Sequence, residues 1–252
     1  MKKILPFRVP EVTCHPETAA VFGVLESLNL GKEWIYTNFI MTDAFVLQGD
    51  MYHNHLDLVL EPGYDSASTC PWIDRSEIRE DILEALTEDN IITILKKLIL
   101  ADNYIYVTVE ESVFLHKEAP LYHELFLYGY DDQARRFHVA DFTFRNRYSL
   151  ETVSFEEMEK AYEMAKGYTG GTIVCWRVNK DAKYLFDVSL VERSFKEYLD
   201  GWSYKSRYVE SYYQGSESFG GIDLYGFLAE HMYERDNQML KCLHNLYDHK
   251  SL

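Results

Sequence analysis

The sequence predicts a protein of the α+β class, in which paired strands and helices occupy separate runs of the chain. Segments rich in aromatic and β-branched residues lie in the middle, separated by short turn-like stretches. Amphipathic helical patterns precede and follow these segments. The 252 residues are 47% hydrophobic, which is enough apolar material for one domain with a sizeable core, or for one domain with an appendage.

The first hundred residues are expected to contain helices on either side of a strand-rich stretch. Pro16 suits the first turn of a helix, and Gly31 lies soon after its expected end. The strand-rich stretch contains a turn signal at Gly49-Asp50. The elements predicted here are a helix over 16–28, strands within 34–60, a loop over 61–72 and helices over 76–87 and 90–100.

The remaining chain predicts a sheet followed by helices. Strands are expected over 104–109, 122–128, 137–142 and 172–178, and helices near 188–199, 222–234 and 237–248. The turn-like run Gly129-Tyr130-Asp131-Asp132 makes the second and third strands a hairpin. Ser154 followed by Glu157 is a capping-box pattern that begins another helix. We therefore divide the chain into an α+β core over 1–180 and a mainly helical portion over 181–252, which either stands apart or belongs to the same domain.

Charge and cysteine usage exclude several classes of protein. A net charge of −16 opposes non-specific binding to nucleic acid, which depends on Lys and Arg at the phosphates, and it equally disfavours an anionic membrane surface. No run approaches the ~20 apolar residues of a membrane span, and Pro6, Arg8 and Pro10 interrupt the N-terminus, so a cytoplasmic protein is expected. The four cysteines are far apart without a C-x-x-C motif, which indicates neither a zinc site nor a disulfide scaffold.

Cys14 is the one cysteine placed at the start of a predicted helix. Backbone N–H groups and the helix dipole at such a position favour an anion, so they are expected to lower the pKa of the thiol and to supply donors to an oxyanion. Cys70, Cys175 and Cys242 have no comparable placement. Cys14 is therefore the candidate nucleophile.

His123 and Asp141 lie on the two strands of the predicted hairpin. Their spacing of 18 residues allows both side chains to reach one end of a sheet and form an imidazole–carboxylate contact. With Cys14 they provide a thiol, a base that activates it and a carboxylate that orients the base. The alternative is structural, with His123 at a strand edge and Asp141 closing a turn.

Other polar groups carry weaker signals. Glu110 and Glu111 follow a predicted strand and are more typical of a solvated loop than of a contact with a cationic amine substrate. His53, His55 and Asp57 alternate, which indicates a polar sheet face or groove wall more than a metal site. No serine-hydrolase elbow or phosphate-binding glycine loop is present. We expect no cofactor and no bound metal.

The hairpin residues carry a resemblance to a known family. His123, Gly129, Tyr130, Asp131, Val139 and Asp141 match the pattern of bacteriocin-leader peptidases of the papain-like cysteine peptidase superfamily, and Cys14, ahead of Thr18, Ala19 and Ala20, matches its nucleophile helix. The chain more closely resembles the N-terminal domain of the butirosin biosynthesis protein H family, including the runs 219–229 and 247–250. This resemblance implies a papain-like fold, with the nucleophile helix packed on an antiparallel sheet and a helical C-terminal portion.

The same resemblance implies an activity. Members of this family move an acyl group from a carrier-protein thioester to an amine in the biosynthesis of antibiotics and other natural products, so the expected partners are an acyl or peptidyl carrier protein and a small-molecule amine. Leader peptidases carry a glutamine just before the cysteine, whereas this chain has Val9 to Thr13, which favours thioester exchange over peptide cleavage. A cysteine peptidase or thioesterase and a non-catalytic carrier- or substrate-binding module are the alternatives. Three basic pairs are candidate docking points for a carrier, at 96–97, 135–136 and at 145 with 147.

Overall fold

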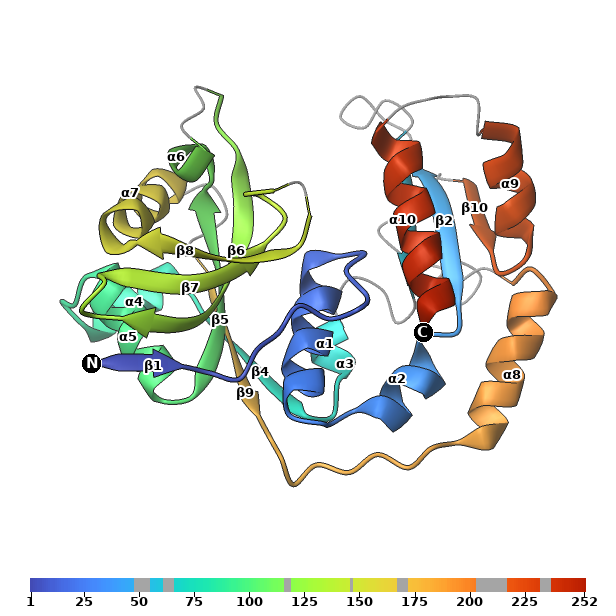
Figure 1. Cartoon of the computed structure of the whole chain (residues 1–252), viewed down its shortest axis with the longest axis horizontal. Coiled ribbons are helices and arrows are strands. Elements are labelled where there is room, and N and C mark those ends of the chain that lie inside the picture. Colours follow the sequence, from blue (N-terminus) through green and yellow to red (C-terminus); the bar gives the residue numbers. More distant parts are fainter. Residues whose placement is uncertain are drawn as a thin grey trace. The chain divides into compact units, whose positions relative to one another are not determined.

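A computed structural model confirms the α+β class (Figure 1). It describes residues 1–47, 55–60, 66–115, 119–145, 147–166, 172–202, 217–231 and 237–252. These residues form ten helices and ten strands. They divide into two compact units, the first with Met1–Pro10, Ala20–Leu30 and Cys70–Ala182 and the second with Glu11–Ala19, Gly31–Thr69 and Lys183–Leu252.

A seven-stranded sheet forms the centre of the first unit. Six strands follow the order β4-β9-β5-β6-β7-β8, and β1 pairs with the C-terminal end of β6. All of these described pairs are antiparallel. The strands are β1 (Lys2–Ile4), β4 (Ile73–Ile78), β5 (Asn103–Glu110), β6 (Tyr122–Asp131), β7 (Arg136–Asp141), β8 (Ser149–Ser154) and β9 (Ile173–Val178).

The central strand β5 is covered on both faces, which explains its nearly continuous apolar sequence. Helices α5 (Ile91–Leu100) and α7 (Phe155–Ala165) pack against it. Asn90 caps the first of these helices, and Ser154 caps the second through the predicted capping box. The unit also contains the short helices α4 (Glu80–Leu86) and α6 (Ser112–Leu115) and most of α1 (Pro16–Ser27).

The second unit contains a smaller antiparallel sheet, four longer helices and one helix of a single turn. Its strands lie in the order β10-β2-β3, with bounds β2 (Thr42–Leu47), β3 (His55–Leu60) and β10 (Glu217–Gly220). The helices described here are α2 (Lys32–Asn38), α3 (Ser66–Thr69), α8 (Val188–Leu199), α9 (Asp223–His231) and α10 (Asn237–Ser251). A buried cluster of Ala44, Leu224, Phe227, Leu228 and Cys242 joins α9 and α10 to β2.

The helices with strong caps or clear periodicity are confirmed, as is the hairpin of β6 and β7. Four local predictions are wrong. The turn predicted at 129–132 lies within β6 up to Asp131, because the strand continues that far, and Ser66–Thr69, expected in a loop, forms the short helix α3. The stretch from Trp34 is helical in α2, because Trp34 and Ile35 turn one helical face into the core, and Ser76 belongs to strand β4, which ends before α4 begins at Glu80. The turn at 49–50 and His53 lie outside the described residues, whereas His55 and Asp57 belong to β3.

The units also divide the chain differently from the sequence-based split at residue 180. The C-terminal residues from Lys183 form one unit with Glu11–Ala19 and Gly31–Thr69, and the C-terminal strand β10 pairs with β2. The described part of the chain includes no helix with both the length and the apolar character needed to cross a bilayer.

Candidate functional site: a histidine between two buried carboxylates

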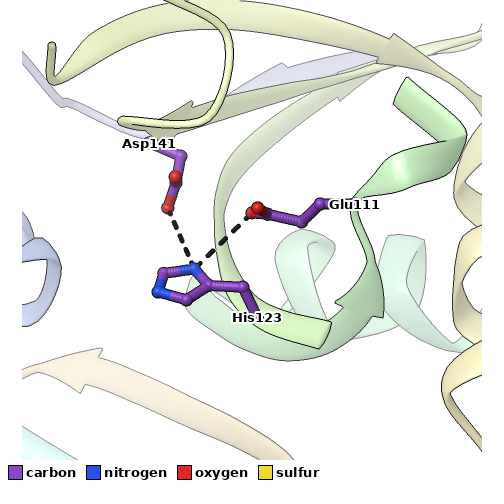
Figure 2. Close-up of side chains that lie close together, drawn as sticks. All are labelled: Glu111, His123 and Asp141. Atoms are coloured by element: carbon purple, nitrogen blue, oxygen red, sulfur yellow. Dashed lines mark ion pairs between the residues drawn. The ribbon is translucent and has the colours of Figure 1, made fainter. Parts of the chain in front are cut away.

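Three strand ends meet at one edge of the large sheet. Because β6 runs antiparallel to both β5 and β7, the end of β5, the start of β6 and the end of β7 lie together. Glu111 follows β5, His123 is the second residue of β6, and Asp141 is the last residue of β7. Figure 2 shows these three side chains turned toward one another.

The imidazole of His123 faces both carboxylates through the same nitrogen. Its Nδ1 lies 3.5 Å from Glu111 Oε1 and 3.9 Å from Asp141 Oδ2. The side chains of Glu111 and Asp141 are 3% and 1% exposed, whereas that of His123 is 43% exposed. The second ring nitrogen, Nε2, points away from both carboxylates (Figure 2), so the two acids contact one side of the ring.

Thr143 holds the two carboxylates in place. Its hydroxyl oxygen lies 2.5 Å from Glu111 Oε1 and 2.6 Å from Asp141 Oδ1, and its backbone N–H donates to Asp141 Oδ1 at 2.9 Å. A hydroxyl has one proton, so it can donate to only one of the two acids at a time. Asp141 Oδ2 accepts no hydrogen bond from the described residues.

The charges at this site shift the pKa values in a consistent direction. The facing Glu111 carboxylate, aided by the charge of Asp141, raises the pKa of His123 to about 9 against the opposing effect of burial. Burial raises the pKa of Asp141, although Thr143 and His123 act in the other direction. Imidazolium is therefore the favoured form of His123 at neutral pH.

Glu111 corrects an expectation from the sequence. Glu110 and Glu111 were expected in a solvated loop, but both are buried. Glu110 accepts hydrogen bonds from the backbone N–H groups of Ser112 and Leu121, while Glu111 faces His123. The sequence did contain a signal for this contact. Glu110 and Glu111 come at the end of β5, which pairs with the strand of His123, and the ends of neighbouring strands lie close together.

A hollow of about 450 Å³ runs along the sheet beside His123. Tyr106 and Tyr122 line it together with the ion pair of Arg75 and Glu77. Its volume lies in the range of small-molecule sites. Space for a ligand is thus present next to the exposed imidazole.

Cys14 belongs to the second unit, so the structure brings together two of the three predicted residues, His123 and Asp141. Cys14 lies two residues before α1, as predicted, and is 5% exposed. Burial, with the charge of Asp248 adding to it, raises the pKa of the thiol, although the backbone N–H groups of Cys14 and His15 act in the opposite direction. The expected lowering of this pKa is therefore not found in the described state.

The terminal helix α10 contributes to this result through Asp248. Asp248 Oδ2 accepts the backbone N–H of Thr13 at 2.5 Å, and the backbone N–H of Cys14 also favours the ionised Asp248. His244, one turn earlier, lies 3.5 Å from Asp248 Oδ2 and 3.2 Å from Thr13 Oγ1. Asp248 thus takes the N–H of Thr13 and competes with the thiol for that of Cys14, and no local sequence pattern indicates this contact.

The basic pairs considered for carrier docking are mostly paired with acids. Lys96 contacts Asp132, Lys97 contacts Asp89, and Arg135 lies 2.5 Å from Glu156. Arg145 contacts Glu151 in the same way. These cations offer little uncompensated positive charge to an acidic partner.

No protein-family model matches the chain, and no curated protein matches it.

Proposed function

We propose that the protein is a cysteine-dependent acyltransferase, which moves an acyl group from a carrier-protein thioester through Cys14 to an amine. One observation carries the proposal: His123 presents Nδ1 to two buried carboxylates and turns Nε2 away from them (Figure 2). This is the arrangement that a thiol-activating imidazole needs, because the carboxylates fix the ring and stabilise its protonated form. The helix after Cys14 and the antiparallel sheet under His123 support the finer proposal of a papain-like fold.

The first half of the reaction forms an acyl-cysteine. The step begins from the neutral form of His123, whose Nε2 accepts the proton of Cys14, and the thiolate attacks the carbonyl carbon of the thioester. The tetrahedral intermediate then expels the carrier thiolate, which takes the proton back from Nε2. The pKa of His123, about 9, favours the imidazolium that this step produces, whereas the burial of Cys14 disfavours the thiolate in the described state.

The second half transfers the acyl group. An amine attacks the acyl-cysteine while His123 accepts one of its protons, and the Cys14 sulfur leaves and recovers that proton. Water in place of the amine would give a thioesterase, and a peptide in place of the thioester would give a peptidase. The same residues serve all three reactions, and the hollow beside His123 provides room for an acceptor.

A second candidate, a non-catalytic carrier- or substrate-binding module, is favoured by a different observation. Cys14 is buried, and Asp248 occupies the N–H of its neighbour Thr13. A thiol in this setting is a small apolar core group. The two candidates differ in whether Cys14 becomes acylated.

Intact-mass measurement after incubation with an acyl thioester of N-acetylcysteamine tests the proposal. We expect one acyl adduct, located on Cys14 by peptide mapping and missing in Cys14→Ala. His123→Gln should slow its formation by ~10²-fold or more. Added amines then separate transfer from hydrolysis by the ratio of amide to free acid.

His244→Gln is the matched comparison, because it removes the imidazole that lies near Thr13. We expect it to leave the rate of acylation within a few-fold of the wild type. Loss of acylation in His244→Gln but not in His123→Gln would reassign the base. A folded wild type with no adduct at any cysteine would favour the binding module.

A further inference from the structure

We propose that Glu111, His123 and Asp141 form a binding site for one divalent transition-metal ion of the zinc class. The ligand atoms are one oxygen from each carboxylate and Nδ1 of the imidazole, and all three lie within 4.8 Å of one another (Figure 2). They come from three neighbouring strand ends of one unit. The binding step does not depend on the proposed acyl transfer.

The distances between His123 Nδ1 and the two carboxylates fit a shared cation better than direct hydrogen bonds. The separations of 3.5 Å and 3.9 Å from His123 Nδ1 are longer than the usual ~2.9 Å of an N–H···O bond. Two ligands bound tetrahedrally at ~2.1 Å from zinc are separated by ~3.4 Å. Small side-chain movements would therefore bring both carboxylates into contact with one ion.

The local charge also calls for a cation. Glu111 and Asp141 are buried acids that face one imidazole, so even with His123 protonated one negative charge remains. Within the described chain, neither acid is paired with Lys or Arg, and Asp141 Oδ2, in a side chain only 1% exposed, accepts no hydrogen bond while it points toward His123. A divalent ion with neutral His123 would balance both acids.

The donor set selects the kind of ion. One imidazole nitrogen and two carboxylate oxygens suit Zn²⁺, Co²⁺ or Mn²⁺, whereas Ca²⁺ takes six to eight oxygens. Three protein ligands leave a fourth position for water. Thr143 holds both carboxylates, as groups behind metal ligands commonly do, and the exposed side of His123 gives the ion access.

Metal binding would oppose the acyl transfer proposed above, and this consequence rests on that function. A metal on Nδ1 replaces the proton there and leaves the remaining ring proton on Nε2, so the nitrogen that should accept the thiol proton becomes a donor. Zn²⁺ should then inhibit acylation of Cys14, with an inhibition constant equal to its dissociation constant at this site.

The test is titration of the full chain with Co²⁺, followed by its visible absorption, and with Zn²⁺ in competition with a chromophoric chelator. We expect one equivalent to bind in the wild type. Affinity should fall by ~100-fold or more in His123→Ala and Glu111→Gln, which each remove a ligand, and by ~10-fold in Thr143→Val. Circular dichroism confirms that each variant is folded.

Glu124→Gln is the matched control, since this exposed acid neighbours His123 on β6 and is not a ligand. It should bind the metal as the wild type does. Absence of saturable binding in the folded wild type would overturn the proposal, as would binding that persists in His123→Ala or a Co²⁺–thiolate absorption band. Metal binding without any acyl adduct would leave this site standing while refuting the acyltransferase.

Discussion

Replacement of Asp248 by Asn should make Cys14 more reactive toward thiol reagents. The carboxylate accepts the backbone N–H of Thr13 at 2.5 Å, and its charge raises the pKa of the Cys14 thiol. Asparagine keeps an amide oxygen that can accept the same N–H but removes the negative charge. The change therefore separates the electrostatic effect of Asp248 from its hydrogen bond.

The expected magnitude follows from the relation between pKa and thiolate population. Loss of one nearby negative charge should lower the pKa of the Cys14 thiol by ~1 unit, which increases the fraction of thiolate ~10-fold. A less basic thiolate is also a weaker nucleophile, by a factor of ~3 per unit. The net expectation is a rate of disulfide exchange ~3-fold higher, while burial, the larger cause of the raised pKa, persists.

Exchange with a dipyridyl disulfide at pH 7, quenched and resolved by peptide mass spectrometry, measures each thiol separately. Cys70, Cys175 and Cys242 are buried and serve as internal controls. Asp200→Asn, an acid at the end of α8 whose partner is Lys196, is the control variant and should change no rate.

An unchanged or slower rate at Cys14 in a folded Asp248→Asn protein would refute the electrostatic reasoning. A rise shared by all four cysteines would refute it as well, because it would indicate that Asp248 acts by holding the fold closed.

Three further predictions concern stability. Ser154→Ala removes the capping box of α7, in which Ser154 Oγ accepts the N–H of Glu157 at 3.1 Å, and should lower the free energy of unfolding by ~1 kcal/mol in denaturant titration; Glu156→Gln, outside the box, is the control, and an equal loss there would contradict the assignment. Gly221→Ala should cost at least ~2 kcal/mol, because Gly221 has φ +53° and a Cβ would lie 2.1 Å from the Tyr198 carbonyl oxygen; a melting temperature equal to the wild type would disprove this. Burial lowers the pKa of His249 to about 4, below the unfolded ~6.5, so the unfolded state gains a proton first as pH falls, and stability should drop by ~2 kcal/mol between pH 7 and 5. His249→Gln should reduce that drop, and an undiminished pH dependence would argue against the buried neutral imidazole.

Local sequence patterns were sufficient to predict much of the secondary structure of the first unit. The hairpin of β6 and β7 was predicted from a turn signal at 129–132, although the turn itself lies at 132–135, and Ser154 with Glu157 specifies the start of α7. Both elements are therefore predictable from a few consecutive residues. Helix α2 was not, because Trp34 and Ile35 favour strands intrinsically and become helical through burial of one face. The histidine–aspartate contact followed from strand pairing, whereas Glu111 required knowing which strand lies on the other side of β6.

The environment of Cys14 could not be predicted in this way. Its neighbour Thr13 contacts Asp248 across nearly the whole chain, and contacts of such separation leave no local pattern. Helix-start chemistry correctly placed Cys14 before α1. The pKa of its thiol is raised chiefly by burial, to which α10 adds the charge of Asp248.

This long-range contact makes Asp248 the residue that best separates the two functional proposals. If Cys14 is a nucleophile, Asp248 opposes it twice, by disfavouring the thiolate and by competing for the backbone N–H of Cys14, which an oxyanion would use. Asp248→Asn should then accelerate acylation by a thioester at least as much as it accelerates disulfide exchange. If Cys14 is only a buried core thiol, the same variant should speed disulfide exchange and still yield no acyl adduct, because a more reactive sulfur alone does not provide a site that binds and orients the acyl group.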